Sequence, residues 1–155
     1  MLKELLLQKG WAGKTISRQE TIDRLNPIIE QLIRLNYSYD AAERNTKNAR
    51  LASGIATRQK VARADAGKLA ETVFSCGGTA YNGTELEPSD FDTRESNVSM
   101  VEHLLELEQD FRKTLEAEKQ VEHHMRTRAI LSVLKKNSDG RLDFLRETNK
   151  EIRKP

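Results

Sequence analysis

Apolar side chains recur at alternating spacings of three and four residues along much of the chain, the period of an amphipathic α-helix. The first such pattern spans residues 20–47. Its stripe consists of Ile22, Leu25, Ile29 and Leu32, continued by Asn36, Tyr39 and Glu43. Ser17 and Glu20 have the spacing of a capping box at a helix start. Pro27 is expected to move this start towards residue 27 or to kink the helix, because proline lacks a backbone donor.

A second helical pattern spans residues 49–76. Its stripe consists of Leu51, Ile55, Arg58, Ala62, Asp65, Leu69, Thr72 and Cys76. Gly77 and Gly78 come next, and glycine commonly ends a helix in a left-handed conformation. Residues 79–93 then have no helical period and are rich in turn-forming residues, so they predict a loop.

The length of this loop decides the expected topology. A helix of 28 residues is about 42 Å long, and an extended loop of about 17 residues spans up to about 56 Å. Adjacent antiparallel helices need a connection of only about two to eight residues. We therefore expect the loop to run the length of the bundle, so that the third helix starts parallel to the second.

The second half of the chain predicts two more helices and a tail. The third should begin near Arg94 or Glu95 and bend or end near residues 116–120. Its stripe consists of Val101, Leu104, Glu108, Phe111 and Leu115. The fourth is expected to present Val121, Met125, Ala129, Ile130, Val133 and Leu134. Residues 137–140 (Asn-Ser-Asp-Gly) are typical of a stop, after which Leu142, Leu145 and Ile152 indicate a short C-terminal helix.

These elements predict an all-α fold, a four-helix bundle with one long crossover between its second and third helices and a short C-terminal helix. A bundle with short first and third connections and one long central crossover has the ferritin-like arrangement. Residues 1–19 are interpreted as a leader segment and residues 20–155 as the bundle domain.

Four segments resemble a bacterial family of stand-alone ferritin-like four-helix bundles, a family catalogued only as domains of unknown function. They are residues 21–26 (Thr-Ile-Asp-Arg-Leu-Asn), Tyr37 through Ala41-Ala42-Glu43, Gly77-Gly78 and Glu108-Gln109-Asp110. The resemblance covers roughly residues 20–150 and implies the fold and an ancestry of metal binding, with no established reaction. One position departs from the pattern: Leu105 stands where the family has a second glutamate, one turn before Glu108.

Three carboxylates, Glu43, Asp65 and Glu108, fall on the apolar stripes of three different helices. Burying an unpaired charge is costly, so something must neutralise them. One hypothesis is a metal ion, with Glu122 or His124 completing the ligand set. Iron suits carboxylate and imidazole ligands, but the chain has no Glu-x-x-His motif, which di-iron bundles use.

The other hypothesis is neutralisation by protein groups. Arg58 lies seven residues before Asp65 on the same stripe, and Tyr37 or Tyr39 can donate hydrogen bonds. The histidines, His103, His123 and His124, all lie in the second half of the chain. Since neighbouring residues on a helix point about 100° apart, at most one of the last two can face inward.

Composition and charge exclude several classes of protein. Of the 155 residues, 32% are charged and 5% aromatic, which suits helices with wide solvated faces. The net charge of +2 gives no reason to expect nucleic acid as a partner. Residues 5–7 form an apolar run too short for a signal peptide or membrane span. A single cysteine, Cys76, excludes an intramolecular disulfide, and we expect a cytoplasmic protein.

These observations predict a non-enzymatic, self-associating helical module with no catalytic residues and no cofactor. One alternative is a carboxylate-bridged di-iron protein that oxidises or stores iron. Another is a scaffold whose acidic loop, residues 85–95, binds a basic partner, since residues 79–110 hold nine acidic side chains and one basic side chain. Trp11, between Gly10 and Gly13, is expected to anchor the leader on the bundle or on a second subunit.

Overall fold

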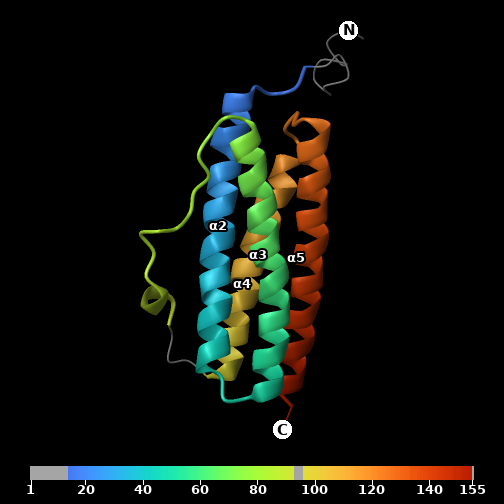
Figure 1. Cartoon of the computed structure of the whole chain (residues 1–155). Helices are drawn as coiled ribbons and strands as arrows, with labels where there is room; N and C mark the ends of the chain where they lie inside the picture. The colour runs from blue at the N-terminus through green and yellow to red at the C-terminus, as the bar shows by residue number, and fades with distance from the viewer. Residues whose placement is uncertain (1–13, 93–95, 155) are drawn as a thin grey trace.

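The computed structural model describes residues 14–92 and 96–154, and within them the chain is helical with no strand. The long helices are α2 (Arg18–Asn45), α3 (Ala49–Ser75), α4 (Asn97–Glu118) and α5 (Met125–Ile152). A short 3-10 helix, η1, covers Pro88–Phe91. The long helices pack side by side (Figure 1), so the predicted all-α helical bundle is confirmed.

The chain forms two antiparallel hairpins joined by a crossover. α2 pairs with α3 and α4 pairs with α5, while α2 also packs on α4 and α3 on α5. From the end of α3, the chain returns along the outside of the bundle to its opposite end, passing η1, which packs against α2 (Figure 1). As a result, α3 and α4 point in the same direction, as the loop length predicted.

The ends of the first hairpin follow the sequence signals. Ser17 caps α2: its hydroxyl accepts from the backbone N–H of Glu20, whose side chain accepts from the backbone of Ser17. Pro27 lies inside α2, which starts at Arg18, so of the two expected effects the later start is wrong. Ile28 and Ile29 are buried beside it and hold the helix through packing. Gly77 ends α3 with φ of 88°, the predicted left-handed stop.

The predicted break at residues 137–140 is wrong, and with it the separate C-terminal helix. α5 is continuous from Met125 to Ile152. The polar side chains of Asn137 and Ser138 do not mark a helix end. They donate hydrogen bonds to buried carboxylates inside the bundle. Gly140 is one of the described glycines without a positive φ, so it has the conformation of an ordinary helical residue.

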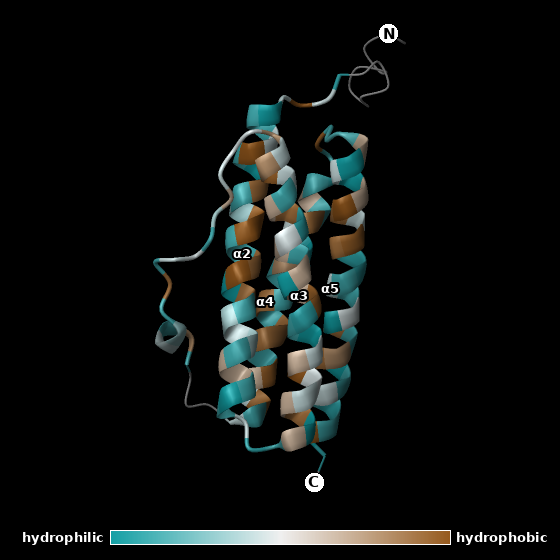
Figure 2. Cartoon of the chain, viewed as in Figure 1, coloured by the Kyte–Doolittle hydropathy of each residue, from teal (hydrophilic) through white to brown (hydrophobic). Residues whose placement is uncertain are grey.

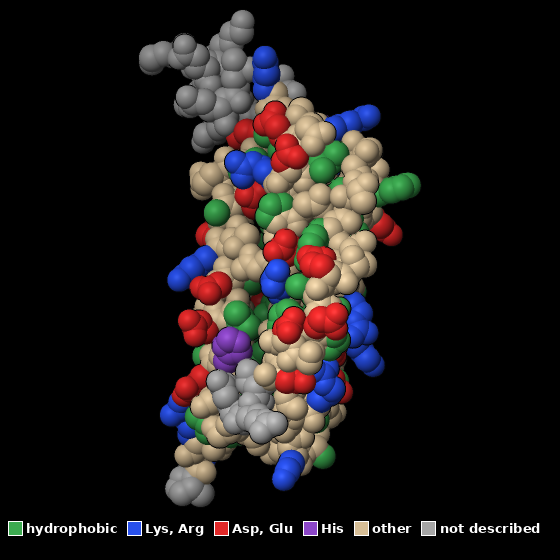
Figure 3. Space-filling model, turned by 90° about the vertical axis from the view of Figure 1, so that its left-hand side faces the viewer, with side chains coloured by type: hydrophobic (Ala, Val, Ile, Leu, Met, Phe, Trp, Pro, Cys, Tyr) green, Lys and Arg blue, Asp and Glu red, His purple; other side chains and the backbone are tan. Residues whose placement is uncertain are grey.

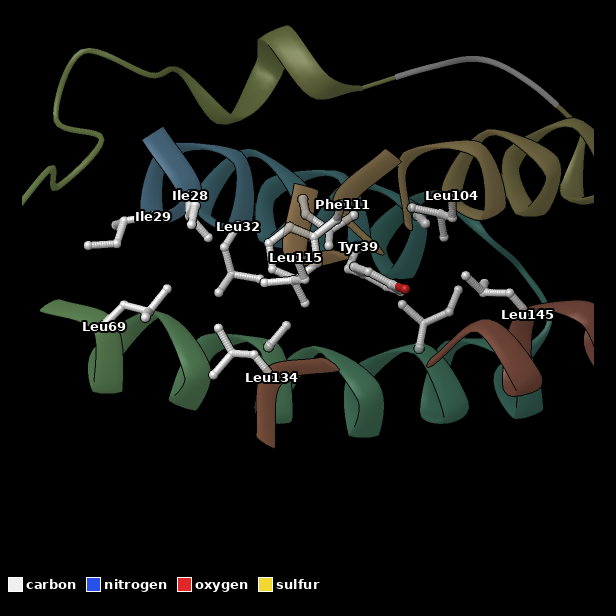
Figure 4. Packing of buried hydrophobic residues seen from close by; sticks show 14 of the residues in the cluster. Ile28, Ile29, Leu32, Tyr39, Leu69, Leu104, Phe111, Leu115, Leu134 and Leu145 are labelled. Atoms are coloured by element: carbon white, nitrogen blue, oxygen red, sulfur yellow. The ribbon is translucent and has the colours of Figure 1, made fainter. Parts of the chain in front are cut away.

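The core forms where the stripes of the long helices meet, and brown, hydrophobic positions line the helices in Figure 2. Its side chains point into a common interior (Figure 4). The predicted α4 stripe is confirmed, since all five of its residues are buried. The predicted α5 stripe is confirmed only in part: Leu134 is buried as predicted, but Met125 and Val133 are exposed, and Leu131, which the pattern did not include, is buried.

Some sequence predictions fall outside the described residues. Trp11 and most of the leader are among these, as are residues 93–95 of the acidic loop and the predicted start of the third helix at Arg94 or Glu95. α4 is seen from Asn97, with Ser96 as its N-cap. At the other end of the bundle, the backbone N–H of Ile16 donates to the carbonyl of Glu122 at 2.9 Å. No helix in the described part of the chain has the length and apolarity needed to span a bilayer.

The continuity of α5 leads to a first prediction. A Cβ added to Gly140 meets no atom within 4 Å. Because glycine is a poor helix former, Gly140→Ala should raise the free energy of unfolding by about 1 kcal/mol. The measurement is urea unfolding followed by circular dichroism. The matched control, Gly77→Ala, has equal space but a positive φ and should lower stability. A loss of stability in Gly140→Ala would instead indicate a turn at residues 137–140.

Candidate functional site

A charged cluster occupies the middle of the bundle interior. Glu108 of α4 and Asp65 of α3 are both fully buried, and Arg141 of α5 is 1% exposed. The Nε of Arg141 donates to Oε1 of Glu108 at 2.6 Å, and its Nη2 donates to Oε2 at 3.2 Å. The Nη1 of Arg141 lies 3.6 Å from Oδ2 of Asp65. One guanidinium therefore lies between two buried carboxylates from different hairpins.

Neutral donors complete the environment of Glu108. The hydroxyl of Tyr39, on α2, donates to Oε1 at 2.8 Å. The hydroxyl of Ser138, on α5, donates to Oε2 at 2.7 Å. Together with the two bonds from Arg141, each oxygen of Glu108 accepts two hydrogen bonds. This saturates the carboxylate, which is the condition for burying it without a large desolvation penalty.

Asp65 is held less completely. The side-chain amide of Asn137 donates to its two oxygens at 2.9 and 3.2 Å. The Nζ of Lys68, one turn further along α3, lies 3.6 Å from Oδ1 of Asp65. The nearest group of Arg141, Nη1, is buried and makes no hydrogen bond. Asp65 thus has an ion pair at longer range and fewer strong donors than Glu108.

The pKa values follow from this arrangement. Burial raises the pKa of the Asp65 carboxyl, and the hydrogen bond from Asn137 and the charge of Arg141 offset only part of that rise. Burial and then the charge of Glu108 raise the pKa of Tyr39, so its hydroxyl stays a donor. Burial lowers the pKa of Arg141, but the charge and hydrogen bonds of Glu108 outweigh it, and the net pKa is raised.

The five predicted metal ligands do not lie together. Asp65 and Glu108 share the central cluster. Glu43 is half-buried near the end of α2 and makes no bond to that cluster. Glu122 pairs with Arg128, outside the core. His124 is exposed at the start of α5, where its ring contacts the hydroxyl of Thr15.

Sequence reasoning named the wrong neutralising cation. Arg58 lies over the ring of Phe144 at 4.5 Å instead of pairing with Asp65, and Tyr37 stacks on Phe91. Of the proposed donors, Tyr39 is in the cluster. Arg141 was missed because it lay beyond the expected break. The signal that could have found it is its spacing of seven and four residues from Leu134 and Leu145, a helical period that continues through Gly140.

A second buried polar group lies at the end of the bundle where α4 leads into α5. His123 is 1% exposed, and its Nε2 lies 3.0 Å from Oε1 of Glu118. Glu118 also accepts from Arg24 of α2 at 3.0 Å. The sequence had placed at most one of His123 and His124 inward, and His123 is the buried one. These three residues hold the start of α2 against the connection between α4 and α5.

The central donor set does not fit a di-iron centre. Such a centre needs an inward glutamate from two helices and a Glu-x-x-His from each of the other two. Here α2 contributes a tyrosine, α3 and α4 one carboxylate each, and α5 an arginine whose charge lies between those carboxylates. Within residues 14–92 and 96–154, no three His, Cys, Asp or Glu side chains are grouped closely enough to hold a metal ion.

The acidic crossover makes one ion pair with the bundle and one hydrogen bond within itself. Asp92 accepts from Arg44 at 2.6 Å, and Glu85 accepts from the hydroxyl of Tyr81. On the face that carries the crossover, acidic side chains gather over the middle, with basic side chains among them and towards the edges (Figure 3). Of the four acidic groups of residues 85–92, Asp92 is thus paired with a cation of α2 and Glu85 is hydrogen-bonded within the crossover.

Comparison with known proteins gave no match, either to a model of a protein family or to a curated protein.

Removal of the central cation should be the most damaging single change in the core. Arg141→Met keeps the aliphatic stem but leaves Glu108 and Asp65 buried without a cation. We expect the free energy of unfolding to fall by about 3–5 kcal/mol, as when one partner of a buried ion pair is lost. Urea unfolding of the wild type and the variant measures this fall in the free energy of unfolding. Arg146→Met, at an exposed position of the same helix, should change stability by less than about 0.5 kcal/mol.

A double variant separates charge from packing. Adding Glu108→Gln to Arg141→Met should restore part of the lost stability, because the uncompensated carboxylate is then removed. Equal stabilities for Arg141→Met and Arg146→Met would contradict the account of the cluster.

Asp65 should make stability depend on pH. Its pKa is raised in the folded protein above the unfolded value of about 3.9, so the folded state binds the proton more tightly. Protonated Asp65 therefore stabilises the folded state. This stabilisation is complete at pH values below the pKa of Asp65 in the unfolded chain, and it is lost as the pH rises through the pKa of Asp65 in the folded protein. Asp65→Asn removes this titration. Its unfolding free energy relative to wild type should therefore increase as pH rises from about 4, the unfolded pKa.

Unfolding curves at a series of pH values measure this difference. Asp143→Asn, at an exposed position of α5, serves as control and should show a flat difference. A decreasing difference for Asp65→Asn would mean that ion pairing, and not burial, dominates at Asp65.

Proposed function

We propose that this protein is a ferritin-like helical bundle that acts as a non-enzymatic, self-associating module. The topology supports the first part of this proposal. Two antiparallel hairpins are joined by a crossover that runs the length of the bundle, and α3 and α4 are parallel. This is the connectivity of ferritin-like folds.

The observation that carries the proposal is the central position of Arg141. In di-iron bundles the bundle interior holds metal ions between carboxylates. Here the guanidinium supplies the positive charge between Glu108 and Asp65, and Tyr39 and Ser138 satisfy the remaining acceptors. The cluster thereby stabilises one packing of the helices. Its polar groups bond to one another, which leaves none of them to bind a substrate.

Self-association is supported by apolar side chains left in water. Phe74 is 79% exposed and Met125 is 86% exposed, by far the highest values among large apolar side chains of the described residues. Phe74 lies near the end of α3 and Met125 starts α5, so both lie at the same end of the bundle. Contiguous exposed apolar surface marks protein interfaces; if Phe74 and Met125 form such a surface, a second copy offers the same one for an isologous dimer.

Sedimentation velocity over a concentration series tests this proposal. We expect the wild-type chain to self-associate, and Phe74→Ser combined with Met125→Ser to weaken association at least tenfold, since burying each side chain contributes about 2 kcal/mol. Elemental analysis of the same preparations, grown with iron and purified without chelators, should find far less than one iron per chain.

A matched control uses another exposed apolar residue of α3. Val61 is 37% exposed and lies about 140° around the helix from Phe74. Val61→Ser should leave association unchanged. A monomeric wild-type chain at all concentrations would overturn the self-association proposal, and stoichiometric iron would favour the di-iron alternative.

A further inference from the structure

A hollow lies on the outside of the first hairpin, away from the central cluster. It has a volume of about 270 Å³ and is formed where α2, α3 and the crossover meet. Asn36 and Asp40 of α2 line it on one side, and Gln59 and Arg63 of α3 on the other. Pockets for drug-sized ligands measure about 300–1,000 Å³, so this one suits a smaller molecule.

One buried acceptor behind the wall of the hollow has no donor. The side-chain oxygen Oδ1 of Asn36 is shielded from solvent and receives no hydrogen bond from the described part of the chain. Gln59, only 4% exposed, does not supply one. Its amide donates to Oδ1 of Asp40 at 2.5 Å and to the backbone carbonyl of Asn36 at 3.4 Å. Because buried polar atoms are nearly always satisfied, this oxygen indicates a missing donor.

The hollow also holds two opposite charges that do not pair. Within residues 14–92 and 96–154, neither Asp40 nor Arg63 forms an ion pair with each other or with a third residue. A guanidinium presents a planar set of donors that matches a carboxylate. Asp40 presents a carboxylate that accepts a hydrogen bond from Gln59. A molecule between them would meet a negative group at one end and a positive group at the other.

Apolar and aromatic groups form the rest of the lining. Ile33 and Ala66 contribute aliphatic surface. Tyr37 is fixed by stacking on Phe91, with ring centroids 5.1 Å apart and planes 17° from parallel. At Gly83, where φ is 70°, a Cβ would lie 2.9 Å from Cγ2 of Ile33. Glycine thus lets the crossover approach α2 closely enough to bound the hollow.

We infer that this hollow binds a small zwitterion, an α-amino acid with an aliphatic side chain. Its ammonium group donates to Asp40, and Arg63 binds its carboxylate. Ile33 and Ala66 contact its side chain. The inference uses no residue of the central cluster and no residue of the proposed self-association surface, so it stands or falls separately from the proposed function.

Isothermal titration calorimetry of the full chain with L-leucine tests the inference. Two analogues separate the charges: 4-methylpentanoate lacks the ammonium group, and 3-methylbutylamine lacks the carboxylate. We expect leucine to bind and each analogue to bind at least tenfold more weakly, since hydrogen bonds to charged groups are the stronger class. Leucine should also shift the side-chain amide resonances of Asn36 in a nitrogen-15 correlation spectrum.

Variants identify the groups that bind. Arg63→Gln and Asp40→Asn should each weaken leucine binding at least tenfold. Asparagine at position 40 can still accept from Gln59, so the fold should be kept, and thermal unfolding checks this. The controls are Arg50→Gln and Asp23→Asn, at exposed positions of the same two helices. They should leave binding unchanged.

Three outcomes would overturn the inference. The first is no heat and no shift of the Asn36 resonances at millimolar leucine. The second is binding of either analogue as tightly as leucine. The third is an equal effect of Arg63→Gln and Arg50→Gln, which would place the binding elsewhere on the surface.

Discussion

The ion pair between Glu108 and Arg141 constrains the whole bundle. Both groups are buried, so each must be neutralised and hydrogen-bonded where it lies. Glu108 accepts donors from α2 and α5 at the same time, and Arg141 extends towards Asp65 on α3. A slip of any helix by one turn would separate these groups and leave a charge unpaired in the core. The cluster therefore fixes the register of four apolar surfaces that could otherwise slide past one another.

The sequence predicted the helices well wherever apolar residues alone set the pattern. All five residues predicted for the stripe of α4 are buried, because Val101, Leu104, Phe111 and Leu115 are ordinary core residues around one carboxylate. The crossover was predicted from the length of the loop and from the helix end at Gly77. Prediction failed in α5, where polar residues occupy the inward face. Asn137 and Ser138 looked like the end of a helix because their partners, Asp65 and Glu108, are remote in the sequence.

The same cause explains how much of the candidate site could be predicted. Two of its carboxylates and Tyr39 were found, since each interrupts an apolar stripe at helical spacing. Arg141 could not be paired with them without knowing that α5 continues. The ligands proposed at Glu122 and His124 depended on a helix that began at residue 121, whereas α5 begins at Met125. That difference of four residues moves both side chains into the connection outside the core.

The crossover divides the chain into two hairpins of similar length, residues 18–75 and 97–152. The faces that the hairpins bury against each other join α2 to α4 and α3 to α5. These contacts do not require both hairpins to come from one molecule. If the crossover extended from one bundle to the next, two chains could exchange their second hairpins and reproduce every helix contact described above, including Tyr39 to Glu108. Domain swapping is thus compatible with this topology, and the crossover is the hinge that would permit it.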